Sequence, residues 1–106
     1  MKAPTSDMSQ LQSESIDRLF QVVLGLQSVE ECYAFFSDLC TVKELQDMAQ
    51  RLDAARMLEN GENYQTISRE IGISTATISR VSRCLNYGSG GYRRAIEKMR
   101  TPEEKV

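Results

Sequence analysis

Apolar residues recur every three or four positions along most of the chain, which is the period of an amphipathic helix. Between residues 11 and 26 they cover an arc of about 200°, well beyond the ~100° of an ordinary surface helix. A face this wide needs burial on two sides, so the pattern predicts that this helix meets a second chain. The apolar residues of the segment are Ile16, Leu19, Phe20, Val22, Val23, Leu24 and Leu26.

Capping signals divide the rest of the chain into further helices. Capping boxes, in which Ser or Thr is followed three residues later by Glu, occur at residues 28–31 and 41–44. Gly61 and Gly72 suit left-handed helix ends, and the glycine-rich segment 88–91 is typical of a flexible break. No segment alternates with a period of two, so we expect no sheet. The predicted helices span residues 11–26, 29–39, 42–60, 64–71, 75–85 and 92–100.

This pattern predicts an all-α protein with one folded domain. The chain has 106 residues, which is enough for a single domain with a modest core. We expect a flexible N-terminal end over residues 1–10, one all-helical domain over residues 11–100 and a C-terminal tail over residues 101–106.

The segment from Tyr64 to Val81 has the pattern of a helix-turn-helix, with two short helices around a turn that contains glycine. Gly72 can adopt the positive φ of the turn, Ser74 can cap the second helix, and the small Ser68 allows the helices to cross closely. The pattern places the whole motif at about residues 64–85. The residues expected to face inward are Ile67, Ile71, Ile73, Ile78 and Val81. An ordinary helical hairpin that packs into its own core is the alternative interpretation.

The outward face of the second helix carries short polar side chains and two arginines, a combination suited to the major groove of DNA. Arginine can form paired hydrogen bonds with guanine, and we expect Arg83 and Thr77 to face the groove. Further basic and polar residues before and after this helix are placed to contact phosphates. The predicted DNA contacts are Thr66, Arg69, Thr75, Ala76, Thr77, Ser79, Arg80, Arg83, Arg93 and Arg94.

The charge distribution agrees with this interpretation. The whole chain has a formal net charge of −2, which argues weakly against nucleic-acid binding. However, residues 1–64 contain five Lys/Arg and eleven Asp/Glu, whereas residues 65–100 contain seven Lys/Arg and two Asp/Glu. Basic residues therefore concentrate where a phosphate-contacting surface is needed. A solvated basic face without a partner is the other explanation.

Composition argues against several other classes of protein. The chain has no histidine, which removes the commonest general base and metal ligand, so we expect neither an enzyme nor a metal or cofactor site. Its three cysteines, Cys32, Cys40 and Cys84, form no C-x-x-C pair and indicate no disulfide framework or zinc site. The first twelve residues lack the apolar stretch of a signal peptide, and no run is long enough to span a membrane. We therefore expect a cytoplasmic protein.

Residues 41–85, with Arg51, Gly61 and the segment I-G-I-S-T-A-T-I-S-R at residues 71–80, resemble the Trp repressor superfamily. Within it the chain is most similar to the YerC/YecD type of Trp-repressor-related proteins, over about residues 14–100. The resemblance implies a six-helix fold that interlocks with a second copy into a homodimer, with the first helices of the two chains wrapped around each other.

The resemblance also implies a ligand pocket, because in the Trp repressor a corepressor binds between the helix-turn-helix and the core of the partner chain. Arg51 and Arg80 match the groups that flank the ligand's ring, Thr41 one near its carboxylate, and Leu39 and Cys40 groups near its amine. The positions that match the pocket are Leu39, Cys40, Thr41, Arg51, Arg80, Val81 and Cys84.

Two of these positions depart from the repressor, and both departures argue against free L-tryptophan as the ligand. Val81 replaces a glycine that lets the backbone approach the indole, unless its side chain instead points into the core. Cys84 replaces a serine, and sulfur is a weak hydrogen-bond acceptor for an ammonium group. The identity of any corepressor stays open.

The preferred interpretation is a sequence-specific regulator that binds double-stranded DNA as a homodimer and represses transcription by occupying its operator. The alternative is a helical protein-interaction module that uses the helix-turn-helix core only for packing. The DNA-binding head of a transposase or initiator is a third, less favoured interpretation, because only residues 101–106 follow the last predicted helix.

Overall fold

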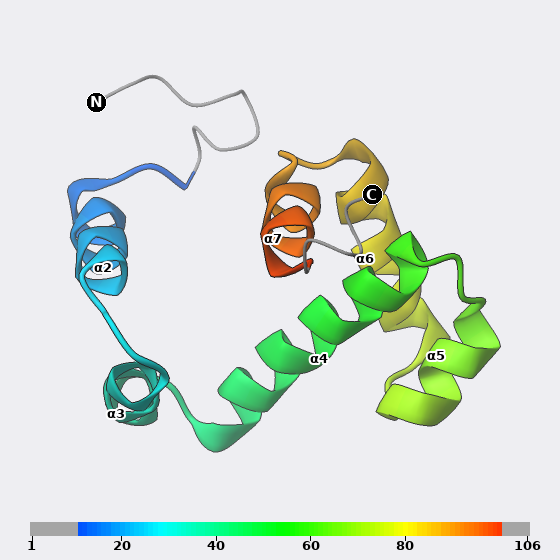
Figure 1. Ribbon diagram of the computed structural model, residues 1–106, viewed down its shortest axis with the longest axis horizontal. Coiled ribbons are helices and arrows are strands. Elements are labelled where there is room, and N and C mark those ends of the chain that lie inside the picture. Colours follow the sequence, from blue (N-terminus) through cyan, green and yellow to red (C-terminus); the bar gives the residue numbers. More distant parts are fainter. Residues whose placement is uncertain (1–10, 101–106) are drawn as a thin grey trace. The chain divides into compact units, whose positions relative to one another are not determined.

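The predicted all-α class is confirmed: the computed structural model describes residues 11–100, and within that range it contains six helices and no strand (Figure 1). None of these described helices is both long and apolar enough to cross a membrane. The end and the tail predicted at residues 1–10 and 101–106 lie outside the described residues. The helices are α2 (Glu14–Leu24), α3 (Val29–Leu39), α4 (Val42–Glu59), α5 (Tyr64–Ile71), α6 (Thr75–Tyr87) and α7 (Gly91–Met99).

The chain divides into two units, residues 1–45 and residues 46–106. The first contains α2, α3 and the first turn of α4, and the second contains the remainder of α4 with α5, α6 and α7. The expectation that residues 11–100 form one domain stays a prediction.

Of the two predicted capping boxes of the first unit, one is complete and the other forms only its N-cap hydrogen bond. The Glu31 N–H donates to Ser28 Oγ at 3.0 Å, but the Glu31 carboxylate accepts from the Gln27 N–H at 3.4 Å instead of closing the box on Ser28. The second box is reciprocal, because the Thr41 N–H donates to Glu44 Oε1 at 2.8 Å and the Glu44 N–H donates to Thr41 Oγ1 at 3.0 Å. The backbone hydrogen bond from Thr41 stabilises the charged carboxylate and lowers the pKa of Glu44.

Helix α2 is shorter than the apolar pattern suggested. It begins at Glu14 because Ser13 is its N-cap, with Ser13 Oγ accepting from the Ile16 N–H at 3.1 Å. It ends at Leu24, and Gly25 is its C-cap. The apolar periodicity continues past both ends, so periodicity alone overestimated the helix by several residues.

The first unit has no buried residue among its described residues 11–45. Large apolar side chains that would occupy a core are open to solvent: Phe20 is 58% exposed, Tyr33 66% and Leu24 84%. Phe35 and Phe36 form one edge-to-face contact, with ring centroids 5.2 Å apart, and both rings are half-buried. The wide apolar face predicted for residues 11–26 is therefore uncovered in the single chain.

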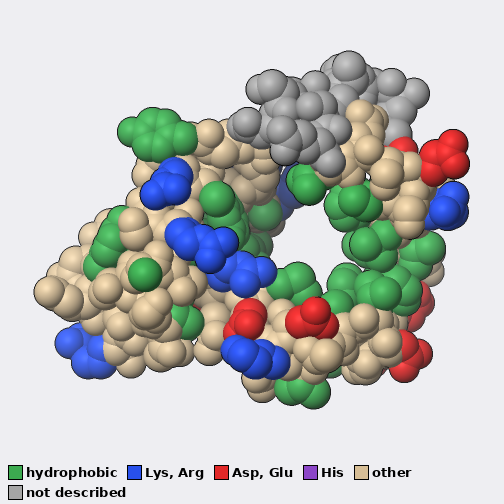
Figure 2. All heavy atoms as spheres, turned by 180° about the vertical axis from the view of Figure 1, so that it is seen from behind, with side chains coloured by type: hydrophobic (Ala, Val, Ile, Leu, Met, Phe, Trp, Pro, Cys, Tyr) green, Lys and Arg blue, Asp and Glu red, His purple; other side chains and the backbone are tan. Residues whose placement is uncertain are grey.

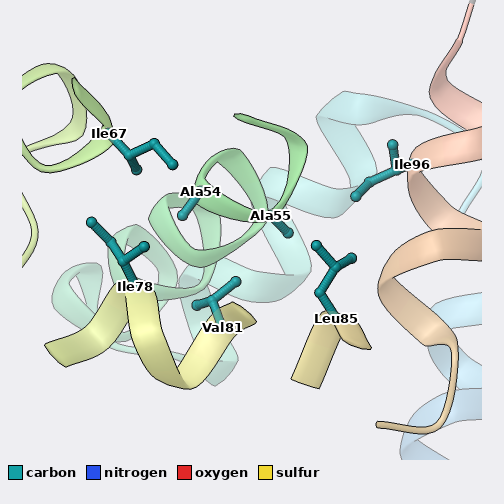
Figure 3. Close-up of a cluster of buried hydrophobic side chains, with 7 residues drawn as sticks. All are labelled: Ala54, Ala55, Ile67, Ile78, Val81, Leu85 and Ile96. Atoms are coloured by element: carbon teal, nitrogen blue, oxygen red, sulfur yellow. The ribbon is translucent and has the colours of Figure 1, made fainter. Parts of the chain in front are cut away.

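The core lies in the second unit (Figure 3). Side chains from four helices converge there: two alanines of α4 meet one isoleucine of α5, three residues of α6 and one isoleucine of α7. The alanines are fully buried, so α4 contributes small side chains to this core and the larger isoleucines come from α5, α6 and α7. The core residues are Ala54, Ala55, Ile67, Ile78, Val81, Leu85 and Ile96.

Gly72, which ends α5 with a φ of 84°, provides a test of the turn. A Cβ atom added there would meet nothing within 4 Å, so the cost of a substitution is conformational. We expect Gly72→Ala to lower the free energy of unfolding by about 1 kcal/mol, and Gly72→Asn to lower it less, because asparagine tolerates the left-handed region. Urea denaturation measures both.

The matched control is Gly91→Ala, because Gly91 lies in the first turn of α7 without a positive φ. Alanine is the better helix former, so this variant should be neutral or stabilising. Equal destabilisation by Gly72→Ala and Gly91→Ala would contradict a special role for the turn.

Candidate nucleic-acid interface

Helices α5 and α6 form the predicted helix-turn-helix, joined by a turn at residues 72–74. The Gly72 N–H donates to the Ser68 carbonyl at 2.8 Å, which closes α5. Ser68 Oγ in turn donates to the Ile73 carbonyl at 2.7 Å, a half-buried bond that fixes the turn to the first helix. Ser74 Oγ accepts from the Thr77 N–H at 3.1 Å and caps α6 as predicted. The small residue at position 68 therefore contributes a hydrogen bond as well as space.

The inner face of the motif agrees with the sequence prediction. Ile67 and Ile78 are fully buried and Val81 is 2% exposed, and all three lie in the core (Figure 3). Ile71 and Ile73 are half-buried and pack against the same cluster. Because α6 is fixed along one side, its opposite side has a defined orientation toward solvent.

That opposite side carries the predicted base-reading residues. Thr75, Ala76, Ser79, Arg80 and Arg83 are all exposed. The two guanidinium groups make no ion pair with any residue in the range 11–100, so their N–H donors remain available to a ligand.

Thr77 differs from the other residues of this set, because it is half-buried. Its hydroxyl lies 3.0 Å from that of Ser74, so part of its hydrogen-bonding capacity is used at the helix start. Helix α6 also runs two residues further than predicted, to Tyr87, and stops where the Gly88 N–H donates to the Cys84 carbonyl at 2.9 Å.

The predicted phosphate contacts differ in how far their side chains are bonded within the chain. Arg69 on α5 is exposed and has no ion pair with the described residues, and Thr66 is half-buried beside it in the first turns of α5. Arg94 is exposed and donates from Nη2 to the Ser89 carbonyl at 3.1 Å. Arg93, in contrast, has its guanidinium bonded within the chain, chiefly to Glu59. No local sequence pattern predicts this pairing, because the partners are 34 positions apart.

Charge differs between the described helices, although Glu70 of α5 and Glu97 of α7 are also exposed. The left side of Figure 2, where α5, α6 and α7 lie, shows Lys and Arg side chains and no Asp or Glu. Acidic residues occur in the first turns of α2, α3 and α4, whereas α5, α6 and α7 have none there. The exposed surface of the helix-turn-helix is therefore suited to a polyanion.

Of the residues in the ligand pocket implied by resemblance, only some lie in the second unit. Arg51, Arg80 and Cys84 are exposed on α4 and α6, and neither arginine forms an ion pair with the described residues. Val81 is 2% exposed and belongs to the core, which is the orientation that the sequence analysis left open as the alternative to a pocket wall. The remaining positions, Leu39, Cys40 and Thr41, belong to the first unit and are described only there.

A concave apolar surface beside Cys84 was not predicted. It has a volume of about 460 Å³ and lies between α4, α6 and the start of α7. The sequence signal was the glycine-rich segment 88–91, which had suggested only flexibility. The lining residues are Leu52, Cys84, Gly88, Ser89, Gly91, Tyr92 and Ala95. Among the described residues, no cluster of three or more His, Cys, Asp or Glu side chains could hold a metal ion.

Comparison with known proteins places this geometry in a family. Residues 14–100 match the family model described as Trp repressor protein. The chain is 50% identical over 96 residues to YerC of Bacillus subtilis, an uncharacterized protein, and this match covers 91% of the chain and 92% of YerC.

Solved structures agree. A crystal structure of a Staphylococcus aureus protein, described as a candidate Trp repressor, superposes with a TM-score of 0.85 at 45% identity and covers 90% of this chain and 95% of that one. The structure of a TrpR-like protein from Eubacterium eligens superposes with a TM-score of 0.82 at 43% identity and covers 85% and 93%. On both its sequence and its fold, the chain belongs to the Trp repressor family of DNA-binding regulators.

Proposed function

We propose that this protein is a sequence-specific transcriptional regulator that binds double-stranded DNA as a homodimer through α6 and represses transcription by occupying its operator. The observation that carries the proposal is the exposed face of α6, where Arg80 and Arg83 have no ion pair within the described residues and the opposite face is buried. A buried inner face holds the helix at a fixed angle, which a reading head requires.

The chemistry of the exposed face suits base recognition. Thr75, Ala76 and Ser79 are short, so the N-terminal half of α6 can enter the major groove deeply. Farther along the helix, a guanidinium can donate two parallel hydrogen bonds to guanine, which is the commonest specific base contact. Arg69 on α5 and Arg94 on α7 are exposed on helices that contact α6, and they supply positive charge for phosphate contacts.

The homodimer is supported by the uncovered first unit. Phe20, Leu24 and Tyr33 are more than half exposed, and the described residues 11–45 contain no buried side chain. Exposed apolar area of this extent is costly in water and marks an interface. A second copy offers the same apolar faces in return, as closed symmetric dimers require. Chromosomal DNA as the target would place the protein in the cytoplasm.

The protein-interaction module remains the second candidate, favoured by the same exposed apolar side chains. Salt dependence separates the two functions. Binding to DNA releases counterions and weakens steeply as salt rises, whereas apolar contact with a protein does not.

The first prediction from the proposed function concerns base reading. Arg83→Ala should weaken binding to a selected DNA site about ten- to a hundredfold, as expected for the loss of an arginine–base contact. The thermal midpoint should stay nearly unchanged, since the side chain is exposed and makes no ion pair in the described range. Fluorescence anisotropy with the selected site and a scrambled site measures affinity and discrimination together.

The control for charge is Arg56→Ala, which removes one positive charge from α4, where Arg56 Nη1 lies 3.6 Å from Asp53 Oδ1. Because Arg56 is outside the helix-turn-helix, this variant should retain discrimination between the two sites. An Arg83→Ala variant that binds the selected site as tightly as the wild type would show that α6 is oriented differently on DNA.

The second prediction concerns assembly. Sedimentation at micromolar concentration should give about twice the chain mass of 12.0 kDa. Leu24→Glu places a charge on a side chain that is 84% exposed in the single chain, so it should be tolerated by a monomer and should disrupt a dimer that buries it. Gln21→Glu adds the same charge at an exposed polar position of α2 and should leave the dimer intact. A folded wild-type monomer at this concentration would rule the assembly out.

The third prediction concerns the ligand. We expect titration calorimetry with L-tryptophan to show no saturable binding in the micromolar range, because Cys84 offers only a weak acceptor for the ammonium group. The loss of a good partner for a buried charged group costs roughly 1–3 kcal/mol. Cys84→Ser restores the stronger acceptor and should bind more tightly than the wild type. A micromolar isotherm for the wild type would restore the tryptophan-sensor hypothesis.

A further inference from the structure

Three helix ends meet at the guanidinium of Arg93. Arg93 Nε donates to the Leu85 carbonyl at 3.0 Å, near the C-terminal end of α6. Its Nη1 donates to both carboxylate oxygens of Glu59, the last residue of α4, at 2.9 and 3.1 Å. Its Nη2 donates to Asn86 Oδ1 at 2.9 Å. Arg93 itself lies in the first turn of α7, so one side chain joins α4, α6 and α7.

Each of these bonds satisfies a group that otherwise lacks a partner in its own helix. Carbonyls of the last turn of a helix have no intrahelical donor, and a cation near them also interacts favourably with the helix dipole. The side chain of Glu59 is 22% exposed, so its ion pair with Arg93 is partly shielded from water.

The bonds continue into the reading helix. Asn86, held at its oxygen by Arg93, donates from Nδ2 to the Ser82 carbonyl at 2.9 Å and lies 3.3 Å from Ser82 Oγ. Ser82 directly precedes Arg83 in α6. A connected path of polar contacts therefore runs from the end of α4 to the part of α6 that carries the exposed arginines.

The chain reversal after α6 is what lets Arg93 reach back to this point. At Gly88 an added Cβ would lie 2.4 Å from the Cys84 carbonyl oxygen, so a side chain would force the backbone apart. The glycine permits a turn tight enough for the start of α7 to lie beside the end of α6.

We propose that Arg93 is a positioning residue that fixes the C-terminal half of α6 against α4 and α7, and that it does not contact DNA phosphates as the sequence had suggested. The influence of Arg93 on DNA binding rests on the proposed function. The set of hydrogen bonds from Arg93 to Leu85, Glu59 and Asn86, here called the junction, can be tested without DNA. If the Arg93 side chain moved out to a phosphate, four hydrogen bonds would break and Glu59 would lose its cationic partner.

The first arm of the experiment is a double-mutant cycle on unfolding, measured at one fixed protein concentration because dimerisation would shift stability. The variants are Arg93→Gln, Glu59→Gln and the double substitution. We expect the two single effects on the unfolding equilibrium constant to be coupled by about fivefold or more, as for residues joined in one network. Additive effects would overturn the junction, whether or not the protein binds DNA.

The second arm measures DNA affinity against salt for variants that remain folded by circular dichroism. Removing an acid normally strengthens DNA binding, yet Glu59→Gln should weaken it about three- to tenfold, because α6 must be ordered on binding. The matched control is Glu62→Gln, which removes an acid from the exposed loop after α4 and should leave binding equal or tighter. Tighter binding by Glu59→Gln would overturn the proposal.

Arg93 variants separate positioning from phosphate contact. Arg93→Gln should weaken binding while keeping the wild-type slope of log affinity against log salt, whereas a lost phosphate contact lowers that slope by about 0.9. Arg93→Lys keeps the charge but not the planar fork, so it should behave like Arg93→Gln. A reduced slope for Arg93→Gln together with wild-type affinity for Arg93→Lys would overturn the proposal. Coupling in the unfolding cycle with no DNA binding by the wild type would refute the proposed function and leave the junction standing.

Discussion

The apolar core that α4 shares with the helix-turn-helix is the constraint on which the second unit depends. Ala54 and Ala55 present almost no side chain, so Ile67 of α5 and Ile78 of α6 can be buried completely against the same stretch of α4. Larger residues at the two alanine positions would separate the helices and change the angle of α6. The orientation of the exposed arginines of α6 therefore depends on the two buried alanines of α4.

Local chemistry explains why much of the fold was predictable. Caps and turns depend on residues within four positions of one another. The N-caps at Ser28 and Ser74, the box at residues 41–44 and the turn at Gly72 all formed as predicted. The errors arose where apolar periodicity outlasts the helix, as at both ends of α2. The inner face of the helix-turn-helix was also predictable, because its spacing follows directly from the helical period.

The site was harder to predict, because side-chain partners far apart in the sequence leave no local signal. Nothing in the pattern around Arg93 distinguishes a surface arginine from one bonded to Glu59. Val81 illustrates the opposite case: the helical period predicted a core residue, and Val81 is buried in the core. The concave surface beside Cys84 is formed by residues of three helices, so no single segment of the sequence predicts it.

The capping of α6 by Ser74 has a consequence for the field in front of the reading helix. Helices α2, α3 and α4 begin with acidic side chains that neutralise the positive end of the helix dipole, whereas α6 begins with a neutral hydroxyl and no acid in its first turn. An N-terminal glutamate would stabilise α6 by a few tenths of a kcal/mol up to about 1 kcal/mol. Because α6 lacks such a residue, its start keeps a positive potential equivalent to that of roughly half an elementary charge. This potential is fixed by the backbone, so, unlike the charge on a flexible arginine, it cannot swing away from an approaching polyanion.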